Sequence, residues 1–507
     1  MLRQKLLFAD AAQYVDKHTV IVNSPGQAPK SHFSALCIKI ALAILKGSVS
    51  MMGKFDDYGK VGFDDERLNK RFPRLIEQLA GKPSASISAA CVDPYQAKAA
   101  YRFVGNDGVT TEALTNITRG VTIENIKSAK PSTLLIPQDT TDLNYTNLKA
   151  TEGLGTIAGS ISLRGFYAHS AIAVSESGDI YGLLAQKMWV RQDENFGVVT
   201  DRSMIPIEEK ESYRWLETMV NAQSSLPEDI FAVHICDREG DIFELFCKAG
   251  EINANYLCRI QYNRIVNDED DTKRLQEYIT GAPEAGRITL HVPRDSHTNR
   301  AERDALLEIK YGKCTLPKPR NLAKNDEIPK SIEAYFVAAA ETDAPDGQEK
   351  ILWRLITNVP INSFGEAVTL IQWYTQRWKI ETFHRTLKSG CKVEELQYES
   401  AKKLMKLTAI YSIIALQIMD LSYMARVHTE ESCEKCLTED EWKILYRVAK
   451  KTKTLPKKPP TIKEAVVMIA KLGGFLARKS DGFPGVTVIW RGLTSFYTIL
   501  DAVPYLG

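Results

Sequence analysis

The pattern of apolar and polar positions in the middle of the chain predicts a sheet with helices packed on it. Strand-like runs stand at 133–136, 169–174, 180–190, 230–235 and 256–260. Residues 176–179 form a turn signal that joins the second run to the third as a hairpin. Helical spacing occurs at 208–220 and 241–247. The order of strand, hairpin, helix, strand, helix and strand predicts an α/β sheet with an antiparallel edge.

Helical periodicity also precedes this region. Between residues 64 and 107, apolar side chains recur at helical spacing, with Arg67 and Arg71 among the cations between them. A small basic helical domain of this kind could bind DNA, although a solvated amphipathic face explains the same pattern. Residues 1–55 differ in pattern from the rest of the chain, and the methionines at 51 and 52 leave open whether they are an extension.

After the sheet, several β-rich runs between 261 and 357 predict an insertion in the α/β domain. A long helix comes next, at about 364–389, and the chain is helical again beyond about 416. A basic, proline-rich linker runs from 447 to 460, and the apolar segment 462–506 indicates a docking or partner region.

The helix at 364–389 is expected to have two distinct faces. At 100° per residue, one narrow face carries five polar side chains: Tyr374, Arg377, Glu381, Arg385 and Lys388. The opposite face carries Ile380, Phe383 and Leu387. Such a helix can bury an apolar stripe and present one carboxylate among cations.

Composition changes this picture little. The chain has 507 residues, 44% hydrophobic and 25% charged, with a formal net charge of +2. This length favours two or three domains. The scattered cysteines, several inside apolar runs, indicate buried thiols of a reducing compartment. Neither a membrane span nor a signal peptide is evident, so we expect a cytoplasmic protein without a membrane partner.

Three carboxylates are the candidate chemistry. Asp139 and Asp237 each come after a short apolar run that predicts a strand, and Glu381 lies on the long helix. Such carboxylates can hold two Mg²⁺ or Mn²⁺ ions for phosphoryl transfer. The alternative is structural: Asp237 precedes a capping sequence, and Glu381 could form an exposed helical ion pair. His169, His384 and Trp353 are expected to be structural.

At these positions the sequence resembles the DDE transposases of the insertion-sequence-four family, closest to the transposon-five type. The block from Tyr374 through Arg377 and Glu381 to Lys388 matches that family's Y-(2)-R-(3)-E-(6)-K signature. The segments around Asp139 and 236–242 match its two aspartate blocks. Further similarity occurs at 65–79, 100–103, 164–170 and 472–475, so only about the first 50 residues are unmatched.

The resemblance implies an α/β, RNase H-like catalytic domain with a β-rich insertion, between helical DNA-binding and dimerisation domains. The expected divisions are 1–55 (extension), 56–125 (DNA-end binding), 126–260 (catalytic, first part), 261–357 (insertion), 358–415 (glutamate helix) and 416–507 (dimerisation). Asp139, Asp237 and Glu381 would be both catalytic residues and metal ligands. The expected DNA contacts are Tyr374, Arg377, Arg385, Lys388, Trp353, Arg67 and Arg71, with Trp353 stacking on a flipped base.

The resemblance also implies cut-and-paste transposition by a dimer bound to paired terminal inverted repeats. Hydrolysis would free a 3′ hydroxyl, a hairpin would form and reopen, and the 3′ ends would attack target DNA. Two other functions stay open. One is a nuclease that cuts without joining, and the other is an inactive or inhibitory DNA-binding protein derived from a transposase.

Overall fold

The computed structural model describes residues 55–502 except 61, 83–84, 92, 192, 194–204, 269–270, 293–301, 323–324 and 479–480. The expected extension at 1–55 therefore lies almost wholly outside the described residues. The described part of the chain begins with four helical segments: η3 (Phe55–Gly59), α3 (Glu66–Gly81), α4 (Ile87–Ala90) and α5 (Pro94–Gly105). Helix α3 buries Phe72, Leu75 and Ile76, which is the apolar face that its periodicity predicts.

A five-stranded core carries the middle of the chain. In spatial order its strands are β4 (Ile180–Trp189), β3 (Ser160–Ser175), β1 (Thr133–Asn144), β5 (Phe231–Cys236) and β6 (Asn255–Arg259). Strands β1, β3 and β4 pair antiparallel, whereas β1, β5 and β6 run parallel. The short β2 (Gly155–Ile157) also pairs with β3. This order and these directions are those of an RNase H-like sheet, so the predicted fold class is confirmed.

The predicted β-rich insertion is present and extends the same sheet. It consists of β7 (Ile265–Asp268), β8 (Asp271–Arg274), α9 (Leu275–Gly281), β9 (Gly286–Val292), β10 (Arg303–Pro317), η7 (Arg320–Leu322), β11 (Ser331–Glu341) and β12 (Leu352–Thr357). Strand β12 returns beside β6, so the core and the insertion form one twelve-stranded sheet.

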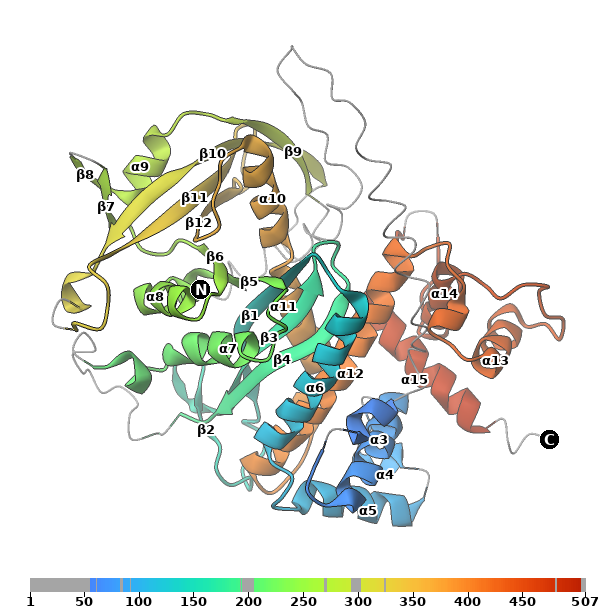
Figure 1. The fold of residues 1–507 in the computed structure, drawn as a ribbon. Coiled ribbons are helices and arrows are strands. Elements are labelled where there is room, and N and C mark those ends of the chain that lie inside the picture. Colours follow the sequence, from blue (N-terminus) through green and yellow to red (C-terminus); the bar gives the residue numbers. More distant parts are fainter. Residues whose placement is uncertain are drawn as a thin grey trace.

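Helices cover both faces of the core. On one face, α6 (Thr111–Ala129) and α12 (Ala401–Val427) lie side by side across β4 (Figure 1). Helix α6 has no counterpart among the elements expected from the sequence. The helices α7 (Tyr213–Gln223) and α8 (Phe243–Glu251) pack beside each other, with the short η5 (Ile207–Glu209) before them and η6 (Arg238–Gly240) between them.

The single helix predicted at 364–389 is instead three connected segments. Helix α10 (Phe364–Thr375) ends in a turn, α11 (Trp378–Arg385) comes next, and η8 (Thr386–Gly390) is a π-helix. The turn arises because the amides of Gln376 and Arg377 bond to carbonyls three residues earlier, which tightens the backbone locally. The predicted apolar face is correct, because Ile380, Phe383 and Leu387 are fully buried.

The remaining C-terminal helices are η9 (Val393–Glu395), η10 (Cys433–Lys435), α13 (Glu439–Lys450), α14 (Ile462–Leu472) and α15 (Val486–Ala502). Helicity thus resumes at 401 rather than near 416. Helix α12 is long and apolar enough to cross a membrane, but 78% of its most apolar window is buried inside the protein. Its hydrophobicity is accounted for by this packing. The eight cysteines among the described residues are buried free thiols, as expected.

Candidate active site

Asp139 lies within β1 rather than after its end. The strand continues to Asn144, so the expectation that both aspartates come after strand ends is wrong for Asp139. The polar residues beyond Asp139 stay in the strand because β3 pairs with them antiparallel: Asp139 stands opposite Ser170, and Asn144 opposite Gly165. Asp139 is 3% exposed, and its carboxylate accepts a hydrogen bond of 2.7 Å from the Thr140 amide.

Asp237 comes directly after β5, as predicted. The parallel register pairs Pro137 with Ile235, and two residues further on it brings Asp139 beside Asp237. A contact of 3.6 Å from Gln138 Nε2 to Cys236 Sγ supports this continuation. Asp237 also caps η6 by accepting a hydrogen bond of 2.7 Å from the Glu239 amide, so the structural interpretation of its sequence is correct as well.

The two neighbours of Asp139 in the strand are held on the opposite face of the sheet. The imidazole of His169 bonds to Thr140 Oγ1 at 2.8 Å and to Gln138 Oε1 at 3.1 Å. His169 is fully buried and lies edge-on to Trp215 of α7 at 4.6 Å between ring centroids. The expectation of a structural histidine is confirmed for His169. By fixing both neighbours of Asp139, this network fixes the backbone that carries the carboxylate.

Glu381 comes from α11, which packs against β1, β3 and α12. Its carboxylate accepts a hydrogen bond of 2.6 Å from Arg377 Nη2, one helical turn earlier. The two side chains are only 14% and 11% exposed. The sequence left open whether Glu381 forms an exposed helical pair; the pair exists, but it is largely buried.

Arg377 is the group that relates the three carboxylates to one another. Burial alone would lower the pKa of its guanidinium. The pKa is nevertheless raised above its ordinary value, because neighbouring groups favour the charged form: in order of effect, Glu381, Tyr374, Asp237 and Asp139. The positive charge of Arg377 is therefore close enough to interact with all three candidate carboxylates.

The three carboxylates form a donor set of the kind that binds divalent cations. Three carboxylates gathered about one positive charge are the oxygen ligands that Mg²⁺ or Mn²⁺ prefers. As they stand, however, the described residues contain no group of three or more His, Cys, Asp or Glu side chains arranged to hold a metal ion. The donor chemistry fits a divalent cation, provided that Glu381 is released from Arg377. Metal binding at Asp139, Asp237 and Glu381 stays a prediction.

Two aromatic residues expected to touch DNA are buried beside this group. Tyr374 is 4% exposed and Trp353, on β12, is 6% exposed, and their rings meet edge to face at 5.8 Å between centroids. Burial, above all, raises the pKa of Tyr374 to about 12. Its hydroxyl has no hydrogen-bond partner among the described residues. The core position expected for Trp353 is correct, and stacking on a base would require it to be uncovered.

Lys388 and Arg385 lie farther along the same segment. Lys388 Nζ bonds to Asp142 Oδ1 at 3.2 Å, three residues beyond Asp139 on β1, and lies 3.7 Å from Glu394. Arg385 is exposed. The common face predicted for these residues is interrupted, because the tightened turn before α11 and the π-helix after it change the rotation per residue. Their contacts with DNA stay predictions.

The turn between β3 and β4 holds the glutamate-bearing segment in place. Glu176 accepts a hydrogen bond of 2.7 Å from Trp373 Nε1 of α10, and the Gly178 carbonyl accepts one of 2.7 Å from Lys379 Nζ of α11. The same turn reaches the end of α12, where Asp179 Oδ1 pairs with His428 Nε2 at 3.2 Å. Glu381 is therefore positioned by side-chain contacts that link three helices to one turn.

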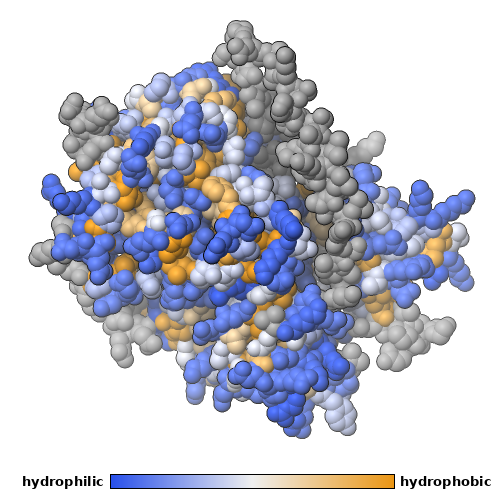
Figure 2. Space-filling view, in the orientation of Figure 1, coloured by the Kyte–Doolittle hydropathy of each residue, from blue (hydrophilic) through white to orange (hydrophobic). Residues whose placement is uncertain are grey.

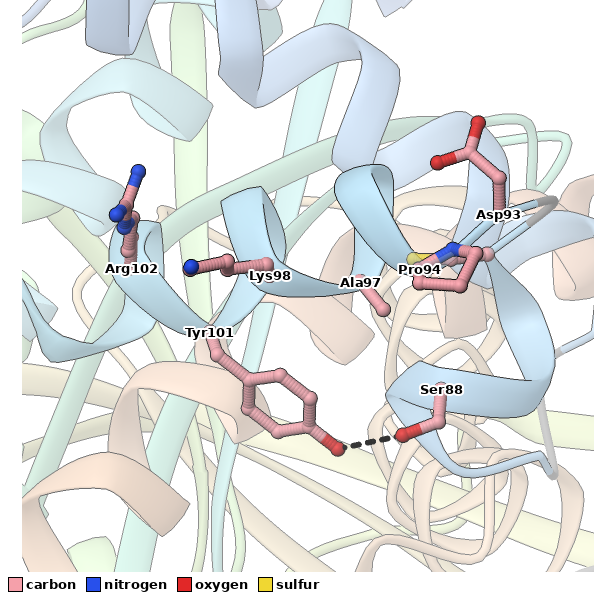
Figure 3. A pocket seen from close by; sticks show the side chains of 8 residues that line it. Ser88, Asp93, Pro94, Ala97, Lys98, Tyr101 and Arg102 are labelled. Atoms are coloured by element: carbon pink, nitrogen blue, oxygen red, sulfur yellow. Dashed lines mark hydrogen bonds between the residues drawn. The ribbon is translucent and has the colours of Figure 1, made fainter.

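The N-terminal helices present a second candidate site. Arg67 is highly exposed and pairs with Asp65, but Arg71 donates hydrogen bonds to Gln78 and Gln96, which gives it a structural role. An open pocket of about 680 Å³ lies along α5 (Figure 3). Its lining includes Tyr101 and Arg102, which fall in the similar segment at 100–103 but were not among the expected DNA contacts, and Lys98, which sequence reasoning missed. Their spacing on one helix face, with exposed Tyr95 nearby, was the available signal.

Two known protein families match this chain, one near the N-terminal end of the described residues and one at the C-terminal end. Residues 56–109 match the transposase DNA-binding family, and residues 413–506 match the transposase Tn5 dimerisation domain. These two matches support a transposase of the Tn5 type. The DNA-binding match spans α3 to α5, where the exposed cations lie, and the dimerisation match spans most of α12 and the helices after it.

Among solved structures, the transposase is similar to a piggyBac transposase synaptic complex with hairpin DNA. The identity is 11%, the match covers 88% of this chain and 82% of that one, and the TM-score is 0.33. This similarity is too distant to carry an argument about mechanism.

Two glycines in the region that matches the dimerisation domain have a clear structural role. A Cβ atom at Gly473 would collide with the Val488 carbonyl, and one at Gly492 would collide with the Ile469 carbonyl. Helices α14 and α15 can therefore pack backbone against backbone only because both positions lack a side chain. This explains the Gly473 of the segment at 472–475.

Proposed function

We propose that the transposase catalyses cut-and-paste transposition with Asp139, Asp237 and Glu381 as its catalytic carboxylates. The observation that carries this proposal is geometric: the parallel register of β1 and β5 brings Asp139 and Asp237 to adjacent positions, and α11, which carries Glu381 paired with Arg377, packs against β1. Acids that are 98 and 144 positions apart along the chain thus lie on elements that pack together. Separate structural roles for the three acids would not require this arrangement.

Two Mg²⁺ or Mn²⁺ ions, held by these carboxylates, would activate the attacking oxygen and stabilise the leaving oxygen. The residues of the chain have separate tasks. Arg377 leaves Glu381 and pairs with a DNA phosphate, which frees the glutamate. Lys388 and Arg385 bind neighbouring phosphates, and Asp139 and Asp237 stay fixed on the sheet.

The proposed reaction proceeds by exchange of phosphodiester bonds. Water first attacks a phosphodiester at the transposon end and releases a 3′ hydroxyl. That hydroxyl attacks the opposite strand, which closes a hairpin and expels the flanking DNA. Water then reopens the hairpin, and the 3′ hydroxyl attacks target DNA. Each step forms one phosphorus–oxygen bond and breaks one, so no oxidant or energy carrier is needed.

The DNA partners are assigned from the architecture. Terminal inverted repeats would bind the N-terminal helices, where Lys98, Tyr101 and Arg102 join Arg67 at the surface. A dimer formed through residues 413–506 would hold two ends together. Trp353 would stack on a base flipped from the cleaved end, after the edge-to-face contact with Tyr374 opens.

The test is cleavage of supercoiled plasmid carrying the element's own ends in Mg²⁺, with end joining measured in the same reaction. Hairpin and excised products, and then insertion into a second plasmid, support the proposal. Cleavage without insertion would favour a nuclease that does not join strands. Specific end binding without metal-dependent cleavage would favour an inhibitory DNA-binding protein.

A further inference from the structure

A single segment of the dimerisation domain concentrates the positive charge of the chain. Residues 447–463, here called the basic segment, contain no Asp or Glu. They contain seven cations: Arg447, Lys450, Lys451, Lys453, Lys457, Lys458 and Lys463. The whole chain carries a formal charge of only +2, so these seven charges leave the remaining residues with a formal charge of −5. The asymmetry makes this segment the expected point of attraction for a polyanion.

All seven cations of the basic segment are exposed, and within the described residues none of them forms an ion pair. Four exposed or half-buried lysines elsewhere, by contrast, form ion pairs with acidic residues three or four positions away. Lys127 pairs with Glu124, Lys248 with Glu251, Lys392 with Glu395, and Lys443, just before the segment, with Glu439. In the space-filling view, hydrophilic side chains cover most of the surface over α13 and α14 (Figure 2). The basic segment therefore presents charges that no intramolecular partner neutralises.

The backbone of the basic segment is held at both ends. At its start, Lys451 takes a left-handed conformation with φ of 51°, and the Thr452 amide bonds to the Arg447 carbonyl at 3.1 Å. Near its end, the Pro460 carbonyl accepts from the Cys433 amide at 2.9 Å, and the Ile462 amide donates to the Glu431 carbonyl at 2.8 Å. A ligand would thus meet cations on an ordered backbone, which lowers the entropic cost of binding.

We propose that the basic segment binds the phosphate backbone of double-stranded DNA outside the terminal-repeat site at 56–109. Seven exposed cations that form no ion pair within the described residues suit contacts to regularly spaced phosphates, which carry no sequence information. The segment lies within the dimerisation match, so a dimer carries two copies. This inference rests on the proposed function, because it assigns a second DNA contact to the same enzyme.

The test is the salt dependence of binding to a duplex of unrelated sequence, measured by fluorescence anisotropy with the full-length protein. One variant replaces Lys450, Lys453, Lys457 and Lys458 with glutamine. The matched control replaces Lys127, Lys248, Lys392 and Lys443 with glutamine, so both variants lose four positive charges.

Thermal unfolding should be similar in the two variants. The slope of log K against log salt is expected to fall in magnitude by about 3–4 in the first variant. In the control it should fall by less than about 1.

Equal slopes for the two variants would overturn the inference. A second arm uses vesicles of phosphatidylcholine with phosphatidylserine. Loss of vesicle binding without a change in the DNA slope would also overturn it, in favour of a lipid surface. Cleavage of the element's own ends in Mg²⁺ is measured in parallel. If the wild-type protein cleaves the element's ends but the salt slopes of the two variants are equal, the proposed DNA contact of the basic segment is wrong and the proposed function stands. If wild type binds no DNA, the proposed function fails as well.

Discussion

The two aspartates and the glutamate are held by different kinds of structure. Asp139 stands on β1 and Asp237 directly follows the adjacent parallel strand β5, so the backbone register sets their separation. Glu381 stands on α11, between a tightened turn and a π-helix, and its carboxylate pairs with Arg377. One half of the site is therefore fixed by the sheet, whereas the other depends on side-chain contacts that can exchange. We infer that assembly of the site is controlled from the glutamate side.

The largest effect on stability should come from a substitution that disturbs the packing under the strand that carries Asp139. Trp215 is fully buried against His169, so Trp215→Ala leaves a cavity under the strand that carries Asp139. The expected loss is about 3–5 kcal/mol in the free energy of unfolding, measured by urea denaturation. Ile161→Ala, at an exposed position of β3, is the control and should cost less than about 1 kcal/mol. Similar losses for both would mean that α7 does not support the aspartates.

Removal of the Arg377 charge should lower the free energy of unfolding somewhat less. The size of this loss should depend on added metal. Arg377→Met leaves the buried Glu381 without its ion-pair partner and removes a positive charge that interacts with Asp237 and Asp139, and we expect a loss of about 3 kcal/mol in EDTA. Mn²⁺ should restore part of it, because an added cation replaces the lost charge. Arg287→Met, which removes an exposed pair with Glu284, should leave the stability nearly unchanged and show no metal response. Equal metal responses of Arg377→Met and wild type would contradict the assignment of a shared cation.

The contact between α12 and the β3–β4 turn should make stability depend on pH. Burial, and then the charge of Asp179, raise the pKa of Asp420 to about 7. The folded protein thus keeps a proton that the unfolded chain loses, and this penalty grows from about pH 4 to about pH 7. Asp420→Asn removes the penalty. The variant should be more stable than wild type by about 1–2 kcal/mol above pH 7, after allowance for partial exposure.

Urea denaturation at several pH values tests this difference. The pH dependence from Asp179 is opposite to that from Asp420, whereas the contribution of His428 also falls as pH rises; both groups are present in both proteins. Hydrogen bonding and the His428 charge outweigh burial and lower the pKa of Asp179 to about 2, so its contribution is lost only as pH falls below about 4. The pKa of His428 is raised, chiefly by its hydrogen bond to Asp179, so that contribution is lost at high pH. A stability difference that does not grow between about pH 4 and 7 would refute the assignment to Asp420.

The smallest effect on stability should come from removal of one hydrogen bond that positions α11. Lys379→Met removes the hydrogen bond to the Gly178 carbonyl and should cost about 1 kcal/mol. Because α11 is then less well fixed, end cleavage should slow several-fold while end binding stays unchanged. Lys392→Met, which removes only an exposed pair with Glu395, is the matched control. If end binding falls as much as cleavage, Lys379 acts on DNA rather than on Glu381.

Local pattern was sufficient to predict much of the fold. The strands that begin at Thr133 and Phe231, the hairpin before Trp189 and the apolar face of the glutamate helix could all be found by periodicity. The signature residues could be found because their types and spacing are specific. Polar residues after Asp139 concealed the true length of β1, because a strand paired on both sides need not alternate.

Long-range pairing could not be predicted in the same way. The return of β12 beside β6, about 100 residues later, joins the insertion to the core. The pairing of Glu176 with Trp373 and the packing of α6 against β4 likewise depend on tertiary structure. Helical spacing brought Arg377 near Glu381, but not near the two aspartates. That convergence requires the strand register and the packing of α11 on β1, neither of which has a local signal.

The most direct test compares wild type with Glu381→Gln in cleavage of supercoiled plasmid carrying the element's ends. Glutamine keeps the size of the side chain but removes the charge that a divalent ion needs. We predict hairpin or excised product from wild type in Mg²⁺, at least about 1000-fold less from the variant, and equal end binding by both. Equal product from the two proteins would show that Glu381 is not a catalytic residue and would contradict the proposed site.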